Sequence, residues 1–495
     1  MKRVLFSLLA AATLASCCPS KGGDGAINVK ISSDIANKNY IGNGAQWDAY
    51  PEAEQWGAKV SDEDWNKLYT RLDFMRPQFV RCLINSPFRY FDAKTGKYDK
   101  TRNIESLSKL LSYCQKNNIT VLFGEYNPPK ASMYMDTAWV SMAVDYLNYL
   151  VNDKGFTCIK YYNFFNEPDG NWTTINGDFD KWATMIRHFD AKMAQYPGLK
   201  DKVALAGPDA VMDYKNGSSK FDTKGWIEQT RDNLGSLMGI YDVHAYPGQK
   251  QVRSGEFAKE LQSLKSAVPA GKQVVLGEAG YKYWRSGDEE LMAEYNRRAK
   301  DHPFTKGSDA NMLVYDYFYG LDMALLGMEV MNNGFSGMAV WMLDDAMHST
   351  GDAGNTKDIK LWGMWNILGE EVFGRPEEEA IRPWYYTWSL MCRYFPAGSN
   401  ILAIEAELPQ HVKVVAGVKD GKYTVAVVNV GKEAAQLNLH LPKSLKGAKE
   451  YLYTEGKLAK DANELPIPSR KDIKFSKCTT VEVAANSFYL LTNME

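Results

Sequence analysis

The sequence predicts an α/β protein: a (β/α)8 TIM barrel followed by a small all-β sandwich domain. Three observations support this architecture. Eight apolar runs recur along most of the chain, and segments with helical periodicity separate most of them. The C-terminal part changes to short runs with turn signals between them, which is typical of a β-sandwich. The chain of 495 residues is long enough for a barrel and a second domain.

The predicted domain boundaries follow from these patterns. The barrel is expected over 27–397 and the sandwich over 398–495. The alternating run 27–33 precedes the barrel and is a candidate to pair with the sandwich instead. Before the last barrel strand, a long interval predicts an insertion with helices near 288–300 and 310–332, partly over the barrel mouth. The eight barrel strands are expected at 41–47, 78–84, 119–126, 158–167, 203–209, 239–246, 273–278 and 336–343.

The N-terminal segment predicts export. Lys2 and Arg3 precede a short apolar stretch and small residues, which is typical of a signal peptide. The four residues that end at Cys17 resemble the lipobox of bacterial lipoproteins, whose cysteine becomes lipidated; an ordinary cleaved signal is the alternative. We therefore expect a signal peptide over 1–16 and a flexible tether over 17–26. The protein would then be a periplasmic or cell-surface lipoprotein, held at the membrane through Cys17.

Composition narrows the class of partner. The net charge of −2 argues against nucleic acid as the main partner, and we expect a monomer. The chain contains 13 Trp and 29 Tyr, and flat aromatic surfaces suit the apolar faces of sugar rings. Most of these aromatic residues must nevertheless fill a large core.

Neither a metal nor a cofactor is predicted. The seven Cys show no C-x-x-C spacing, and the six His do not form the His-x-His pattern of barrel metallohydrolases. Asp242 and His244 alone would be a weak pair of metal ligands. No phosphate-binding loop and no dinucleotide-binding glycine pattern follows a predicted strand.

Two of the predicted barrel strands end on a glutamate, at Glu167 and at Glu278. A carboxyl group at the end of a buried strand is partly desolvated, which favours the protonated form that a general acid needs near neutral pH. Pro168 ends the first of these strands, and Asn166 can offer its amide to a substrate hydroxyl. A structural strand end with a solvated carboxylate is the alternative for either site alone. The presence of two strands that both end on a glutamate favours a catalytic role for the two residues.

This pair resembles the catalytic residues of the retaining glycoside hydrolases of clan A, which are built on (β/α)8 barrels. In those families the acid/base is the Glu of an Asn-Glu pair that ends strand 4, and the nucleophile is a Glu that ends strand 7. Asn166, Glu167 and Glu278 match these positions. The resemblance covers residues 40–395 and is specific for the clan rather than for one family. It implies that Glu167 is the acid/base and Glu278 the nucleophile.

Polar or aromatic side chains also stand at the ends of most other predicted strands, where barrel active sites lie. The resemblance implies that Arg81 lies close to the nucleophile and holds it ionised, and that His244 or Tyr246 contacts the nucleophile or substrate. It implies an aromatic floor under the sugar at Trp341. For each residue alone, a structural role is the alternative. The candidates for substrate binding are Trp47, Asp48, Arg81, Glu125, Asn166, His244, Tyr246 and Trp341.

The resulting prediction is an exported retaining glycoside hydrolase that cleaves β-linked oligo- or polysaccharides by double displacement. We expect the carboxyl groups of Glu167 and Glu278 about 5–5.5 Å apart at the C-terminal face of the barrel. Arg81 and at least one of His244 and Tyr246 should lie within hydrogen-bond reach of Glu278. Two alternatives stay open: a non-catalytic glycan-binding lipoprotein on a barrel scaffold, and a transglycosylase that uses the same residues. The motifs do not predict which sugar is cleaved.

Overall fold

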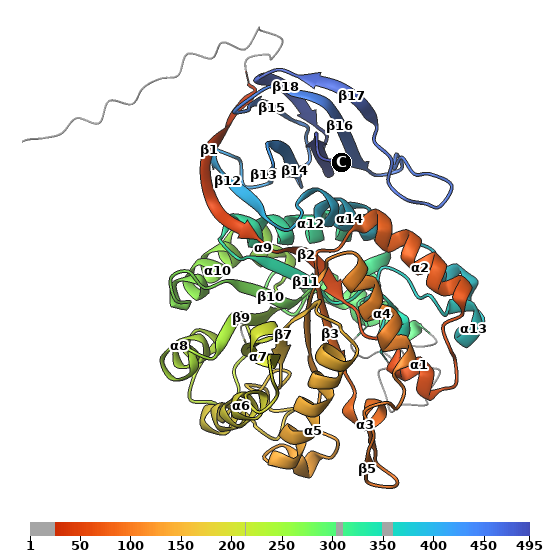
Figure 1. Ribbon diagram of the computed structural model, residues 1–495. Coiled ribbons are helices and arrows are strands. Elements are labelled where there is room, and N and C mark those ends of the chain that lie inside the picture. The colour runs from red at the N-terminus through yellow and green to blue at the C-terminus, as the bar shows by residue number, and fades with distance from the viewer. Residues whose placement is uncertain (1–24, 213, 303–309, 349–359) are drawn as a thin grey trace, which may run out of the picture.

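The computed structural model describes residues 25–212, 214–302, 310–348 and 360–495, which form a β/α barrel and a β-sheet domain beside it (Figure 1). The expected signal peptide and the expected lipidation site at Cys17 lie outside the described residues. Within the described ranges, no helix combines the length and the apolar character needed to cross a membrane.

Eight parallel strands form a closed barrel, which confirms the expected fold class. The strands are β2 (Gly42–Gln46), β3 (Phe79–Ile84), β6 (Thr120–Glu125), β7 (Ile159–Asn163), β8 (Ala204–Val211), β9 (Met238–Ala245), β10 (Val274–Ala279) and β11 (Gly337–Val340). Each overlaps one of the expected runs. β7 is shorter than expected, so Asn166 and Glu167 lie in the turn that follows it. Glu167 itself has a φ of 50°, which is incompatible with a strand.

Helices surround the barrel (Figure 1). They are α1 (Pro51–Gln55), α2 (Asp62–Met75), α3 (Ser86–Arg89), α4 (Glu105–Lys116), α5 (Thr137–Asn148), α6 (Phe179–Met193), α7 (Leu199–Lys202), α8 (Thr223–Leu234), α9 (Gln249–Ser254), α10 (Glu256–Ala267), α11 (Glu289–Asp301), α12 (Tyr317–Asn332), α13 (Gly369–Phe373) and α14 (Trp384–Tyr394). Short turns of 3₁₀ or π helix occur at η1 (Ala131–Met133), η2 (Tyr149–Asp153), η3 (Met312–Tyr315), η4 (Asp345–Met347) and η5 (Pro376–Glu379). β4 (Phe91–Asp92) and β5 (Lys97–Tyr98) form a separate small hairpin.

The amphipathic pattern of α6 explains how such a helix docks on the barrel. Asp178 caps its first turn by accepting a hydrogen bond from the backbone N–H of Lys181 at 3.1 Å. Apolar residues then recur every three or four positions and are buried against the barrel. These residues are Phe179, Trp182, Ile186, Phe189 and Met193.

The helices α11 and α12 lie where the insertion was expected. Residues 319–331 of α12 are all buried, because this helix lies between the barrel and the C-terminal sheet (Figure 1). Tyr317, at its start, stacks on Tyr453 of the sheet with ring centroids 4.4 Å apart. Together with α14, α12 therefore joins the two parts of the protein through apolar contacts.

The C-terminal domain is a nine-stranded sheet in the order β17-β16-β19-β14-β13-β12-β1-β15-β18. On β14, Val425 and Val427 face the domain's own apolar interior, whereas Ala426 and Val428 belong to the core shared with the barrel. The sheet is therefore covered on both faces. Its strands are β1 (Ile27–Tyr40), β12 (Ser399–Glu405), β13 (Val412–Lys419), β14 (Lys422–Asn429), β15 (Ala435–His440), β16 (Leu445–Thr454), β17 (Arg470–Phe475), β18 (Cys478–Val483) and β19 (Ser487–Thr492).

The first strand among the described residues, β1, belongs to this sheet and not to the barrel. β1 pairs antiparallel with β12 and parallel with β15. It contains the alternating run 27–33, and Val29 and Ile31 lie in the apolar interior of the C-terminal domain. The described part of the chain therefore passes through the C-terminal domain before it enters the barrel at β2.

Candidate active site

A cavity of about 440 Å³ lies at the C-terminal ends of the barrel strands. Glu167 and Glu278 both line it. Aromatic side chains form its walls. Two of these side chains, Trp172 and Trp284, lie at the rim and are about half exposed. The aromatic residues that line the cavity are Tyr126, Trp172, Tyr214, Tyr246, Trp284, Trp341 and Trp362.

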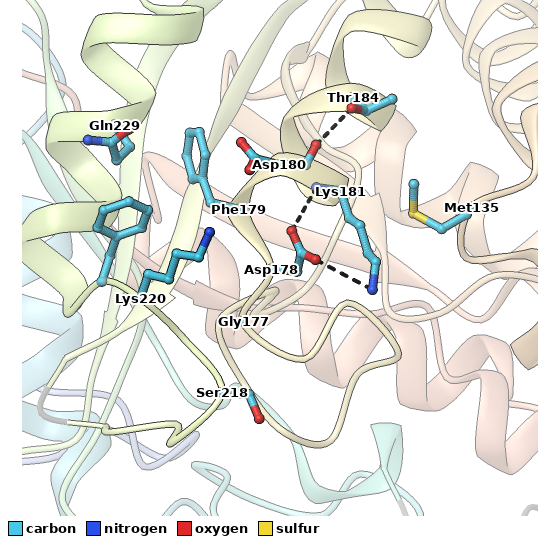
Figure 2. A pocket seen from close by; sticks show the side chains of 11 residues that line it. Met135, Gly177, Asp178, Phe179, Asp180, Lys181, Thr184, Ser218, Lys220 and Gln229 are labelled. Atoms are coloured by element: carbon cyan, nitrogen blue, oxygen red, sulfur yellow. Dashed lines mark hydrogen bonds and ion pairs between the residues drawn. The ribbon is translucent and has the colours of Figure 1, made fainter.

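A second cavity of about 570 Å³ lies at the start of α6, near the loop before α8 (Figure 2). It is larger, but its acidic groups do not form a catalytic arrangement. Asp178 caps α6 and pairs with Lys181 on the same helix, with 3.4 Å between carboxylate and ammonium. Asp180 is exposed to solvent. The buried carboxylates at the barrel mouth therefore make the smaller cavity the candidate active site.

Glu278, at the end of β10, is buried and held by two donors. The Nη1 atom of Arg81 donates to its Oε2 at 2.9 Å, and the Tyr246 hydroxyl donates to its Oε1. Arg81 also donates to Asn166 Oδ1 at 2.7 Å. Burial alone would lower the pKa of Arg81, but the charges of Asp209 and Glu278 raise it above its ordinary value. These charge-assisted bonds orient the Glu278 carboxylate, as expected from the sequence.

Glu167 is less buried and has a different partner. Its Oε1 lies 2.7 Å from Nδ1 of His244, whereas Nδ1 lies 3.9 Å from Oε2 of Glu278. One carboxylate oxygen of Glu167 and one of Glu278 lie within 4.8 Å of each other. The two glutamates therefore share one cavity while each keeps its own hydrogen-bond partners.

His244 is fully buried between Glu167 and a second carboxylate, Asp209. Its Nε2 lies 2.9 Å from Asp209 Oδ1. Burial alone would lower the pKa of His244, but the charges of Asp209 and Glu278 raise it well above its ordinary value. The histidine therefore holds a proton readily in this position.

Asp209 was not among the expected site residues. It is fully buried near the end of β8, where the strand pairing shifts register and the φ of Asp209 is 62°. A bulge of this kind can redirect a side chain. The available signal in the sequence was a carboxylate at the end of the apolar run 203–209.

Two acidic residues near His244 and Asp209 have raised pKa values, which favour their protonated forms. Burial and the neighbouring charge of Asp209 raise the pKa of Asp242 well above its ordinary value. Asp169, which follows Glu167 closely in the chain, has its pKa raised by burial to about 8. In contrast, the charges of His244 and Arg81 outweigh burial and lower the pKa of Asp209. Asp209 is therefore the ionised member of this acidic cluster.

The site residues do not favour a metal ion. Glu167, His244 and Glu278 offer ligand atoms within 4.8 Å of one another. However, the guanidinium of Arg81 contacts both Glu278 and Asp209, at 2.9 and 3.2 Å. Its positive charge would oppose a cation beside either carboxylate.

Neither a scan against protein-family models nor a search of curated proteins found a match. Solved structures do match over nearly the whole chain. A family 30 endoxylanase from Clostridium papyrosolvens has 14% identity and a TM-score of 0.59, covering 94% of this chain and 99% of its own. The catalytic domain of a family 30 xylanase from Talaromyces cellulolyticus has 12% identity and a TM-score of 0.62, covering 94% and 100%. A family 51 α-L-arabinofuranosidase from Bifidobacterium longum has 12% identity and a TM-score of 0.60, covering 96% and 100%.

The chain has the fold of these glycoside hydrolases. The matches cover 94–96% of the present chain, so the similarity spans both the barrel and the C-terminal sheet. The expected fold class is confirmed by this comparison as well as by the closed barrel itself.

Two expected substrate-binding residues do not line the cavity. Trp47 is fully buried and packs against Tyr113 and Trp65, with ring centroids 5.8 and 6.5 Å away. Glu125 is fully buried and accepts hydrogen bonds from Trp139 and other donors on the helix side of the barrel. These donors are Ser86, Tyr90, Trp139 and Tyr162. The expectation was wrong for both because successive side chains of a strand face opposite sides.

The remaining expected residues lie in or directly behind the cavity wall. Asn166, Tyr246 and Trp341 line the cavity. Asp48 is fully buried and supports the wall, since Tyr126 donates to its Oδ2 at 2.7 Å. Arg81 and His244 lie behind the cavity wall, where Arg81 contacts Glu278 and His244 contacts Glu167.

The sequence did not single out the rim of the cavity. Trp172 and Tyr214 lie on loops and contact each other with ring centroids 4.7 Å apart. Lys282 and Trp284 follow β10, and the Lys282 ammonium lies 4.6 Å from the centroid of the Tyr246 ring. The loop after β10 therefore borders the cavity, whereas no described residue of α11 or α12, the helices expected partly over the mouth, lines it. The rim residues lie on loops, where strand periodicity gives no signal.

Proposed function

We propose that the protein is a retaining glycoside hydrolase that cleaves β-linked oligo- or polysaccharides through Glu167 and Glu278. The observation that carries this proposal is the approach of their carboxylate oxygens within 4.8 Å at the C-terminal face of the barrel. Retaining enzymes have carboxyl groups about 5–5.5 Å apart, whereas inverting enzymes need about 6.5–9.5 Å to admit a water. The approach of one oxygen from each carboxylate is compatible with the shorter range, in which one of the two carboxylates reaches the anomeric carbon directly.

The different surroundings of the two glutamates support the division of roles. Glu278 is held by Arg81 and Tyr246, which orient its carboxylate towards the cavity. In the first step, Glu278 bonds to the anomeric carbon while Glu167 gives its proton to the leaving oxygen. In the second step, Glu167 takes a proton from water, whose oxygen replaces Glu278 at the anomeric carbon.

The aromatic walls support a carbohydrate substrate. Rings at the rim, such as Trp172 and Trp284, are exposed enough to stack on the apolar face of a sugar. Trp341 lines the same cavity as the two glutamates and stacks with His348 at a centroid distance of 4.9 Å. This contact fixes the ring, so that it can serve as a rigid platform under a sugar unit.

The test is hydrolysis by the purified protein, with Glu278→Gln as the matched control. The structural neighbours are named as xylanases and an arabinofuranosidase, so the substrates should include xylan, aryl xylosides and aryl arabinofuranosides. We expect release of sugar with retained anomeric configuration, measured by NMR at early time points. The Gln variant should fold normally and lose turnover by about three orders of magnitude or more. An inverted product, or an active Gln variant, would reject the mechanism.

We also propose that the enzyme acts while anchored to the membrane, in the periplasm or at the cell surface. The support is the lipobox-like sequence that ends at Cys17 and the glycine- and lysine-containing tether after it. Anchoring would keep the barrel close to polysaccharides that are bound or imported at the cell envelope.

A further inference from the structure

Asp209 is a buried carboxylate on which three donors converge. Its Oδ2 accepts a hydrogen bond from the backbone N–H of Glu167 at 3.0 Å and one from Nη2 of Arg81 at 3.2 Å. Its Oδ1 lies 2.9 Å from Nε2 of His244. Asp209 therefore contacts the backbone of one glutamate, the histidine beside that glutamate, and the arginine that holds the other glutamate.

We propose that Asp209 is a positioning residue that fixes the tautomer of His244, so that one acidic proton is shared between His244 Nδ1 and Glu167 Oε1. This inference rests on the proposed role of Glu167. A carboxylate only accepts hydrogen bonds, so the atom that faces it, Nε2, carries a hydrogen. The second ring nitrogen, Nδ1, is then the one that gains or loses a proton, and it faces Glu167 at 2.7 Å.

The charges around His244 support this arrangement. Asp209 and Glu278 counteract the effect of burial and raise the pKa of His244, while Arg81 and His244 keep Asp209 ionised. These charges therefore favour a proton on His244, whose Nδ1 faces Glu167. The titratable or charged groups around His244 are Arg81, Glu167, Asp169, Asp209, Asp242 and Glu278.

The shared proton completes the catalytic cycle without another donor. In the first step the proton leaves the pair for the glycosidic oxygen, as that oxygen's bond to the anomeric carbon breaks and Glu278 bonds to the same carbon. The pair is then left with an ionised Glu167 and an unprotonated Nδ1. In the second step a proton from water returns to the pair, the water oxygen bonds to the anomeric carbon, and the bond to Glu278 breaks.

The variant Asp209→Asn tests the inference because it replaces an acceptor with a donor. The Asn oxygen is expected to face Arg81 and the Glu167 N–H, since both are donors, which directs the Asn amide towards His244 Nε2. Nε2 must then accept, and the hydrogen of His244 moves to Nδ1. From Nδ1 the hydrogen is donated to Glu167 and stabilises the ionised form of its carboxyl group. Less protonated Glu167 is then available to act as the general acid.

Kinetics give the first measurement. We expect the basic limb of the kcat/KM profile to move to lower pH by about one unit or more in Asp209→Asn. Glycosides with a poor leaving group should lose at least tenfold more activity than aryl glycosides with a good one, since the latter need little acid. An equal loss for both substrates, with an unmoved basic limb, would mean that Asp209 has only a structural role.

The second measurement does not depend on activity. Proteins labelled with ¹⁵N-histidine report which ring nitrogen carries hydrogen, and His244→Asn identifies the His244 signal among the six histidines. We expect a hydrogen on Nε2 in the wild type and its loss from Nε2 in Asp209→Asn. The matched control is Asp242→Asn, which replaces a carboxyl group whose pKa is raised by burial and by the charge of Asp209, and which should keep the wild-type tautomer.

The outcomes separate this inference from the proposed function. A wild-type protein without hydrogen on Nε2, or an unchanged His244 signal in Asp209→Asn, overturns the inference whether or not the protein is active. If no glycoside is hydrolysed, or if Glu278→Gln stays active, the proposed function fails while the tautomer measurement still decides the role of Asp209. Thermal unfolding of each variant shows that it is folded.

Discussion

His244 Nδ1 lies 2.7 Å from Glu167 Oε1 and 3.9 Å from Glu278 Oε2, so the imidazole contacts the proposed acid/base rather than the proposed nucleophile. Tyr246, two residues further along the chain, donates instead to Glu278. Neighbouring side chains at the end of β9 therefore serve different glutamates. This division lets the protonation of one glutamate change while the other keeps its own hydrogen bonds.

Replacement of Glu167 by alanine should affect substrates according to their leaving group. An aryl glycoside with a good leaving group should still form the glycosyl-enzyme, whereas a natural glycoside should lose about 10²- to 10⁴-fold in rate. Added azide should accelerate turnover of the aryl glycoside and yield a glycosyl azide of retained configuration. The measurement is steady-state kinetics with product analysis; wild-type kinetics without azide rescue would reject Glu167 as acid/base.

The proton on Asp169 should make stability depend on pH. Burial raises its pKa in the folded protein to about 8, so the folded state keeps a proton that the unfolded state releases near pH 4. This contribution is full below pH 4 and is lost as pH rises towards 8, by about 1.4 kcal/mol per pH unit at most. Asp169→Asn should therefore gain stability relative to the wild type between pH 5 and 7.5.

Urea unfolding of the wild type and of Asp169→Asn at pH 5 and at pH 7.5 measures this pH dependence of stability. The difference in unfolding free energy should grow with pH in favour of the Asn variant. A constant difference would show that Asp169 has the same protonation in the folded and unfolded chains.

Gly277 provides the space that the Asp242 carboxyl group occupies. A Cβ atom at this position would lie 2.3 Å from both carboxyl oxygens of Asp242, and the backbone N–H of Gly277 donates to Asp242 Oδ1 at 2.7 Å. Gly277→Ala should thus destabilise the barrel by about 1–3 kcal/mol. The matched control is Gly217→Ala, where an added Cβ meets no atom within 4 Å. Equal unfolding temperatures for the two variants would contradict this reading of the contact.

The proposed anchor predicts a change in fractionation. Cys17→Ser removes the thiol that would carry the lipid, and the full-length protein should move from the membrane fraction to the soluble fraction. Immunoblots of fractionated cells measure this distribution, with Cys18→Ser as the matched control. A wild-type protein that is already soluble would reject the anchor.

Much of the fold follows from sequence pattern alone. The apolar run that leads to Glu167, the strand that carries Glu278 and the helical spacing on α6 follow from local periodicity, which the barrel preserves. The expected contacts of Arg81 and Tyr246 with Glu278 are also confirmed. They could be expected because strands of a parallel barrel bring their C-terminal ends to one face.

The tertiary structure decided which strand-end side chains face the cavity. A shift of one residue turns a side chain to the opposite side, which is why Trp47 and Glu125 lie among the helices while Tyr126 lines the cavity. Asp209 reaches the site through a bulge, a local change of register that periodicity does not reveal. The sequence by itself therefore determined the barrel and its two glutamates, because both follow from local pattern. The partners of each glutamate depend on side chains from several strands meeting in space, and only the closed barrel sets that arrangement.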